Sequence, residues 1–89
     1  MTHANIQKAK QLIADVMCMS SKHGTYYVSI SFFGQNEYLM IDILKNGESP
    51  VYPFKTYRFF MDDEGFEAKA DIALREIDAL AREVGYESL

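Results

Sequence analysis

Hydrophobic residues near the N-terminus recur every three or four positions, which is the period of an α-helix. From about Asn5 to Ser20 this apolar stripe consists of Ile6, Ala9, Ile13, Val16 and Met17, with Leu12 at its flank. Thr2 or Asn5 is suited to cap the start of the helix, and Gly24 is suited to end it. The first element is therefore predicted to be an amphipathic helix.

The middle of the chain changes to a period of two, which is typical of a β-strand with two different faces. This alternation runs from Thr25 to Phe33 and again from Glu37 to Leu44, with the turn residues Gly34-Gln35-Asn36 between the two runs. Because a short turn joins neighbouring antiparallel strands, we expect these two strands to form a hairpin.

A third strand is predicted from about Val51 to Met61. Asn46-Gly47 precedes it and marks a reversal of the chain, because both residues tolerate the positive φ of a type I′ turn. Pro53 has no N–H to donate to a neighbouring strand, so the start of this strand belongs at an edge of the sheet. The three strands are therefore expected to form an antiparallel meander.

The last third of the chain returns to helical spacing. Its apolar stripe consists of Phe66, Ala70, Ala73, Ile77, Leu80, Ala81 and Val84. Asp62-Asp63-Glu64 opens this element, and acids in a first turn are favoured by the helix dipole and cap backbone N–H groups. Asp71 with Arg75 and Asp78 with Arg82 are four residues apart, which is the spacing of ion pairs on an exposed helix face.

These elements predict one α+β domain over residues 1–89 with the order α-β-β-β-α. A chain of 89 residues has room for only one core. Two amphipathic helices with one apolar stripe each are expected to cover the same face of the three-stranded antiparallel sheet. The opposite face of the sheet is then left without a cover.

Ten of the twelve aromatic residues lie between Tyr26 and Phe60, in the predicted strands. The side chains expected to meet the helices are Val28, Ile30, Phe32, Leu39, Ile41, Ile43, Tyr57, Phe59 and Met61. Those expected on the uncovered face are Tyr27, Phe33, Tyr38, Met40, Leu44, Phe54 and Phe60, around Ser29, Ser31, Asp42, Thr56 and Arg58. A large exposed apolar patch usually marks a contact site.

The sequence therefore predicts a small non-enzymatic protein-interaction module, such as an accessory or regulatory protein of a microbe or mobile element. Its partner-binding residues are predicted to be Tyr27, Phe33, Tyr38, Met40, Phe54, Arg58 and Phe60. Face-to-face packing of two such sheets about a two-fold axis makes a homodimer the first expectation, with a heterologous protein partner as the second. Alternatively, a loop or the terminal residues 86–89 fold over the patch.

The charge distribution argues against binding to nucleic acid. The net charge is −4, and residues 61–89 carry nine acids against three bases. Arg58 is the only base on the predicted uncovered face, whereas phosphate binding needs a cluster of Lys and Arg. Double-stranded-RNA-binding domains are similar in element order, but they place lysines where this chain has Asp62-Asp63-Glu64, so the chain is not assigned to that family. A small ligand- or nucleic-acid-binding domain, or an acidic mimic that occupies a basic groove of another protein, is the alternative function.

Candidate chemistry is sparse. Ser20-Ser21-Lys22-His23 combines nucleophile and base types, but adjacent residues in a turn rarely point at one another, so no catalytic residue is predicted. His3, His23 and Cys18 do not form a zinc-binding pattern, and no metal or cofactor is expected. Cys18 is interpreted as a small core residue. The lone cysteine and the lack of a signal peptide or membrane-spanning run favour a cytoplasmic protein.

Overall fold

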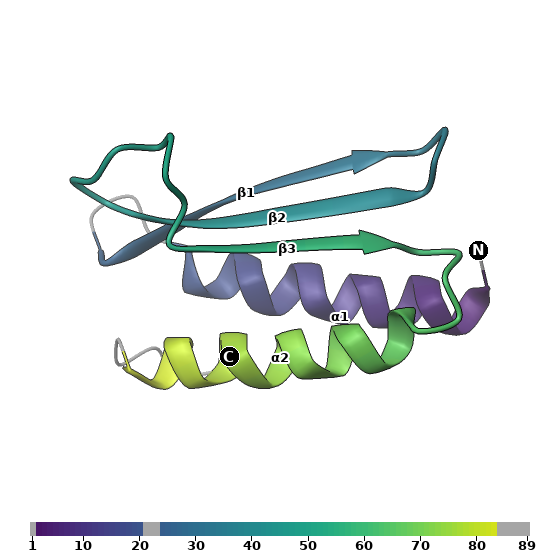
Figure 1. Ribbon diagram of the computed structural model, residues 1–89. Coiled ribbons are helices and arrows are strands. Elements are labelled where there is room, and N and C mark those ends of the chain that lie inside the picture. Colours follow the sequence, from purple (N-terminus) through teal and green to yellow (C-terminus); the bar gives the residue numbers. More distant parts are fainter. Residues whose placement is uncertain (1, 21–23, 84–89) are drawn as a thin grey trace.

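The fold consists of a three-stranded antiparallel sheet with two helices on one side (Figure 1). The computed structural model describes residues 2–20 and 24–83. Along the chain the elements are α1 (His3–Met19), β1 (Tyr26–Phe33), β2 (Tyr38–Lys45), β3 (Lys55–Phe60) and α2 (Phe66–Glu83). The helices contact each other, and α1 contacts β1 while α2 contacts β3. The predicted α+β fold, its element order and the placement of both helices on one face are confirmed.

α1 has nearly the predicted bounds, and its buried stripe contains the predicted Ala9 and Val16 but is centred nearer to Leu12 than predicted. The Thr2 Oγ1 accepts a hydrogen bond from the Asn5 backbone N–H at 3.1 Å, so Thr2 is the N-cap. The buried residues of the helix are Ala9, Leu12, Val16 and Met19. The prediction that Met17 belongs to the buried stripe is wrong, since Met17 is 61% exposed. Helical spacing allows an apolar stripe that includes Met17 or one centred on Leu12. The contacts of α1 with both β1 and α2 select the side of Leu12.

The strand register agrees with the predicted alternation. β1 pairs with β2 so that Ile30 lies beside Ile41, and β3 pairs with β2 so that Tyr57 lies beside the same Ile41. The central strand β2 is the most deeply buried, because Leu39, Ile41 and Ile43 are all at 0% exposure. The helix-facing layer of the sheet is therefore centred on β2.

The connection between β2 and β3 is longer than the sequence predicts. β3 begins at Lys55, so the prediction of a start near Val51 is wrong. Residues 46–54 form a loop instead, and this loop contains Pro50 and Pro53. Neither proline has an N–H for a strand ladder, which explains why regular pairing starts only after them.

Asn46-Gly47 does not form the predicted type I′ turn. Such a turn needs positive φ at both residues, and here only Gly47 has it, at 86°. Asn46 instead continues the pairing of β1 with β2, because its backbone N–H donates to the Thr25 carbonyl at 3.0 Å. Its side-chain amide also donates to the Gly24 carbonyl at 2.8 Å. These two hydrogen bonds hold the start of the loop against the chain that enters β1.

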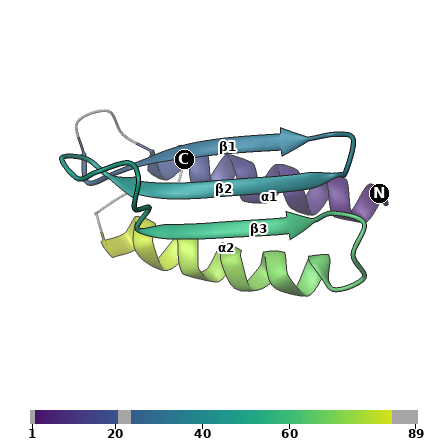
Figure 2. The same ribbon diagram turned by 45° about the horizontal axis from the view of Figure 1, so that its top comes forward.

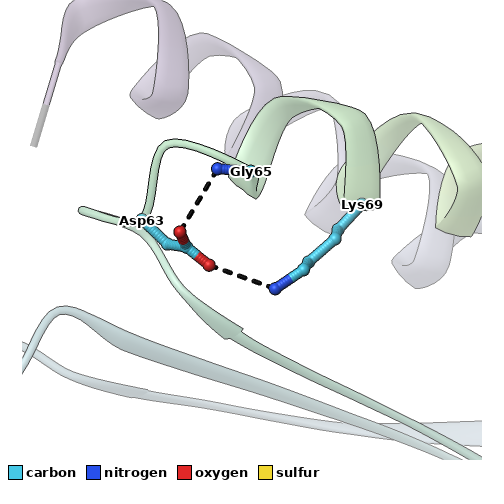
Figure 3. Close-up of polar contacts among 3 residues, drawn as sticks. All are labelled: Asp63, Gly65 and Lys69. Carbon is cyan, nitrogen blue, oxygen red and sulfur yellow. Dashed lines mark hydrogen bonds and ion pairs between the residues drawn. The ribbon is translucent and has the colours of Figure 1, made fainter.

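Asp63 stabilises the turn before α2 (Figure 3). One of its carboxylate oxygens accepts a hydrogen bond from the Gly65 backbone N–H at 3.3 Å, and the other from Lys69 Nζ at 3.1 Å. The hydrogen bond from Lys69, and then that from Gly65, hold the pKa of Asp63 below its usual range. α2 begins only at Phe66, so the prediction that the acids 62–64 form its first turn is wrong, and Glu67 is the acid found there.

Of the two ion pairs that the sequence predicts along α2, one forms and the other is replaced by a pair with α1. Asp78 and Arg82 pair at 3.0 Å, as their spacing predicts. Asp71 pairs at 2.8 Å with Lys8 of α1, so the predicted partner Arg75 is wrong. The reason is tertiary, because the packing of α1 beside α2 brings an ammonium group to Asp71. The predicted apolar stripe is confirmed by the burial of Phe66, Ala70, Ala73, Ile77 and Ala81, while Val84 lies outside the described residues.

A polar contact joins β3 to α2 beside the core. The Tyr57 hydroxyl donates to Glu76 Oε2 at 2.7 Å, and Lys55 Nζ lies 3.0 Å from the same oxygen. Burial, and then the hydrogen bond to Glu76, raise the pKa of Tyr57. The hydrogen bond from Tyr57, and then that from Lys55, lower the pKa of Glu76. The folded protein therefore favours a neutral phenol and an ionised carboxylate at this contact.

We expect Tyr57→Phe to lower the free energy of unfolding by about 1 kcal/mol at neutral pH, which is the contribution of a hydrogen bond to a charged group reduced for partial solvation. The pKa of Glu76 is lowered from 4.5 on folding, so this difference should shrink as the pH falls below that value. The pKa of Tyr57 is raised from 10.0, so the difference should also shrink as the pH rises above 10. Urea denaturation of both proteins at acidic, neutral and alkaline pH measures it, and a difference that is constant across this range would contradict the assignment.

Candidate interaction face

Strand alternation turns one side of the sheet away from both helices, and we call this side the open face. Figure 2 shows it in front of the helices. Its cross-strand rows, from one end of the sheet to the other, are Phe33–Tyr38–Phe60, Ser31–Met40–Arg58, Ser29–Asp42–Thr56 and Tyr27–Leu44. The rows thus contain all the predicted partner-binding residues except Phe54, with Tyr27 at the end of the sheet opposite Phe33.

The first row consists of Phe33, Tyr38 and Phe60, and we call it the aromatic row. The centroid of the Tyr38 ring lies 6.2 Å from that of Phe33 and 4.9 Å from that of Phe60, and both pairs are tilted. Phe33 is 52% exposed and Phe60 is 55% exposed, while Tyr38 between them is half-buried. Tilted rings at these distances attract one another. The aromatic row is therefore a continuous, solvent-exposed apolar strip across all three strands.

The two middle rows of the open face are more polar. Met40 is half-buried beside the exposed Arg58. In the next row the Thr56 hydroxyl donates to Asp42 Oδ1 at 2.9 Å and so joins β3 to β2. One acid and one base thus lie close to the aromatic row. An apolar strip beside a few polar groups is the usual composition of a protein contact surface.

The far end of the open face is less exposed than the end with the aromatic row. Leu44 is only 6% exposed although it lies on the side away from the helices and outside the main hydrophobic cluster. Figure 1 shows the loop of residues 46–54 rising from the sheet on this side, next to the end of β2. Tyr27, the neighbour of Leu44 in its row, is half-buried. The Tyr27–Leu44 row is therefore less exposed than the aromatic row, which lies at the other end of the sheet.

Phe54 lies apart from the other predicted partner-binding residues. Its ring stacks on that of Tyr26 with centroids 5.3 Å apart, and Lys45 Nζ lies 4.4 Å from its centroid. Tyr26 and Lys45 are paired across β1 and β2 and belong by alternation to the helix side. The prediction that Phe54 lies on the open face is wrong. It assumed the alternation of a strand, but Phe54 lies in a loop, where side chains do not alternate.

Some exposed apolar residues were not singled out by the sequence pattern. Phe32 belongs by alternation to the helix side, yet it is 48% exposed. In the loop, Val51 and Tyr52 are 73% and 80% exposed. Pro50 and Pro53, which flank these two residues, are the sequence signal that they lie outside a strand.

The described residues offer little candidate chemistry. Within residues 2–20 and 24–83, His, Cys, Asp and Glu side chains nowhere gather in a group of three that would hold a metal ion. The interpretation of Cys18 as a core residue is wrong, because Cys18 is exposed on the side of α1 opposite the buried stripe. In the same part of the chain, neither α1 nor α2 combines the length and hydrophobicity that crossing a membrane requires.

Comparison of the chain with protein-family models, curated proteins and solved structures finds no match. The surface of the molecule itself is therefore the only guide to its function. Its most distinctive feature is the aromatic row on the open face, where two phenylalanine rings are each more than half exposed.

Proposed function

We propose that this protein is a non-enzymatic interaction module that associates with protein through its open face, as an accessory or regulatory protein of a microbe or mobile element. The observation that carries the proposal is the exposure of Phe33 and Phe60, at 52% and 55%, on the side of the sheet that neither helix covers. Contiguous apolar surface of this kind is uncommon on a monomer, and Phe, Tyr, Met and Arg are enriched in interface cores.

The simplest partner is a second copy of the chain. Two sheets that pack face to face about a two-fold axis bury both aromatic rows in one step. The charges of the open-face strand residues, Asp42 and Arg58, balance each other, although the whole chain has a net charge of −4. A second copy therefore meets no excess of like charge on this face.

The contacts of α2 do not favour the alternative of an acidic mimic. A mimic of nucleic acid would present unpaired carboxylates to a basic groove. Here Asp71 pairs with Lys8, Glu76 with Lys55, and Asp78 with Arg82. Several acids of the C-terminal region are thus partly neutralised within the chain itself.

Tyr38→Glu is the direct test of the proposal. The substitution places a charge at the centre of the aromatic row, so it should abolish face-to-face association and halve the solution mass measured by light scattering. Tyr52→Glu is the matched control, because Tyr52 is 80% exposed in the loop and outside the aromatic row, and this variant should keep the wild-type mass. Far-ultraviolet circular dichroism checks that both variants are folded.

Self-association fails if the wild-type protein has the mass of a single 10.2 kDa chain at micromolar concentration. The open face is not the interface if the protein associates but Tyr38→Glu leaves its mass unchanged.

A further inference from the structure

The outer edge of β1 carries backbone groups that have no partner among residues 2–20 and 24–83. The Thr25 carbonyl accepts from Asn46 N–H at 3.0 Å, so the odd-numbered residues of this strand direct their backbone groups toward β2. The Val28 N–H points the other way and donates to Ser20 Oγ at 3.1 Å. Ile30 and Phe32 have the same outward direction as Val28. Among the described residues, none bonds to their outward N–H groups.

The two edge strands differ in how they are protected against pairing with another strand. β3 contains Lys55 and Arg58 and is preceded by Pro53, which are the features that usually block an edge. β1, with the sequence YYVSISFF, has no charged residue and no proline over its eight residues. An exposed, uncharged and apolar edge strand is a template for strand addition.

Side-chain burial shows the same asymmetry. Phe32 on β1 and Phe59 on β3 both lie beside Leu39 of the central strand, on the same face of the sheet. Phe59 is 5% exposed and meets Phe66 of α2 edge to face, with centroids 5.5 Å apart. Phe32 is 48% exposed. The β1 edge thus has exposed apolar surface beside N–H groups that find no partner in the described part of the chain.

We propose that the outer edge of β1 binds the same edge of a second copy of this chain. Two β1 strands pair antiparallel about a two-fold axis at Ser31, which places Ile30 opposite Phe32 of the second copy. Each outward N–H of these two residues then donates to an outward C=O of the residue opposite. The two sheets join into one continuous sheet.

A second copy fits this edge for two reasons. The outward N–H and C=O groups of Ile30 and Phe32 lie symmetrically on either side of Ser31. A two-fold axis at Ser31 therefore pairs all of these groups at once. The strand is also neutral within a chain of net charge −4, so two copies bring no like charges opposite each other along β1. Phe32 and Ile30 of the two copies pack against one another on the helix side.

This interface is independent of the open face. The two-fold axis at Ser31 is perpendicular to the sheet. Both aromatic rows therefore stay on the same side of the joined sheet and remain accessible. If the open face also self-associates about a two-fold axis that crosses the axis at Ser31 at a right angle, the wild-type assembly closes at four chains, and breaking either interface alone leaves two.

Phe32→Pro tests the edge interface. Proline at this position removes the outward N–H and leaves the pairing of β1 with β2 in place, because the Phe32 N–H does not point toward β2. The variant should have half the wild-type mass by light scattering. Phe32→Val keeps the N–H and should keep the mass. If Phe32→Pro has the wild-type mass, the edge interface is refuted.

Amide hydrogen exchange on the unaltered protein gives a second readout that does not depend on the folding of a variant. The amides of Ile30 and Phe32 should become at least tenfold slower to exchange as the protein concentration rises and the copies pair. The outward amides of Thr56 and Arg58, on the other edge, should stay fast. Equally fast exchange at both edges in the associated protein would overturn the proposal.

The same measurements separate failure of the edge from failure of the open face. If only the edge pairs, Tyr38→Glu remains a dimer and Phe32→Pro becomes a monomer. If only the open face pairs, the two results are reversed, and the amides of Ile30 and Phe32 exchange fast.

Discussion

Phe66→Ala is expected to lower the free energy of unfolding by about 3 to 5 kcal/mol, the usual cost of deleting a buried aromatic ring. Phe66 is 1% exposed, begins α2 and packs edge to face against Phe59 of β3. Loss of its ring leaves a cavity where the helix layer meets the sheet. Because a domain of this size has a total stability of only about 5 to 15 kcal/mol, the variant should be close to the limit of folding.

Urea denaturation followed by circular dichroism measures this loss, with Ile72→Ala as the control on the same helix. Ile72 is 50% exposed, so its truncation should cost about 1 kcal/mol or less. Equal losses for the two variants would show that Phe66 does not lie at the centre of the core.

Phe59→Ala should cost about 3 to 4 kcal/mol of stability, and Phe32→Ala no more than about half as much. The two residues form a matched pair, since both are phenylalanines on edge strands beside the same Leu39. They differ in cover, because Phe59 is 5% exposed under α2 whereas Phe32 is 48% exposed. The measurement is urea denaturation at low protein concentration, where association contributes least.

A loss for Phe32→Ala that equals that of Phe59→Ala at low concentration would contradict this difference in burial. A loss for Phe32→Ala that grows with protein concentration is the result that the β1 edge interface leads us to expect, because association would then cover the ring.

The alternation of side chains made most of the sheet predictable. In β2, Leu39, Ile41 and Ile43 occupy every second position, and a shift of the strand by one residue would turn all three toward the open face. Burial of Leu39, Ile41 and Ile43 together therefore allows only one choice of faces. The aromatic row follows from the same rule, because Phe33, Tyr38 and Phe60 occupy the other phase.

Features that depend on contacts between distant segments were not predictable from local patterns. Helical periodicity alone does not decide whether Leu12 or Met17 faces the core, since apolar residues lie on both sides of α1. The pairing of Asp71 with Lys8 requires the packing of two helices that are far apart in sequence. Phe54 lies in a loop, where no periodicity specifies the direction of a side chain.

Five aromatic residues of the strands, those that are either buried or exposed, thus fall into three different environments. Phe59 and Tyr26 are buried and stabilise the fold. Phe33 and Phe60 are exposed on the open face, and Phe32 is exposed at the β1 edge. Only the first group is explained by the stability of the folded chain, so the other two are where we expect partners to bind.

Hydroxyl-radical footprinting across a range of protein concentrations tests the central claim, that association buries the open face, most directly. Phe33 and Phe60 should be oxidised readily in dilute solution and become protected as the protein associates. Tyr52, which is 80% exposed in the loop, should be oxidised to the same extent throughout. If Phe33 and Phe60 remain as reactive as in dilute solution once the protein has associated, the open face is not the surface through which it does so.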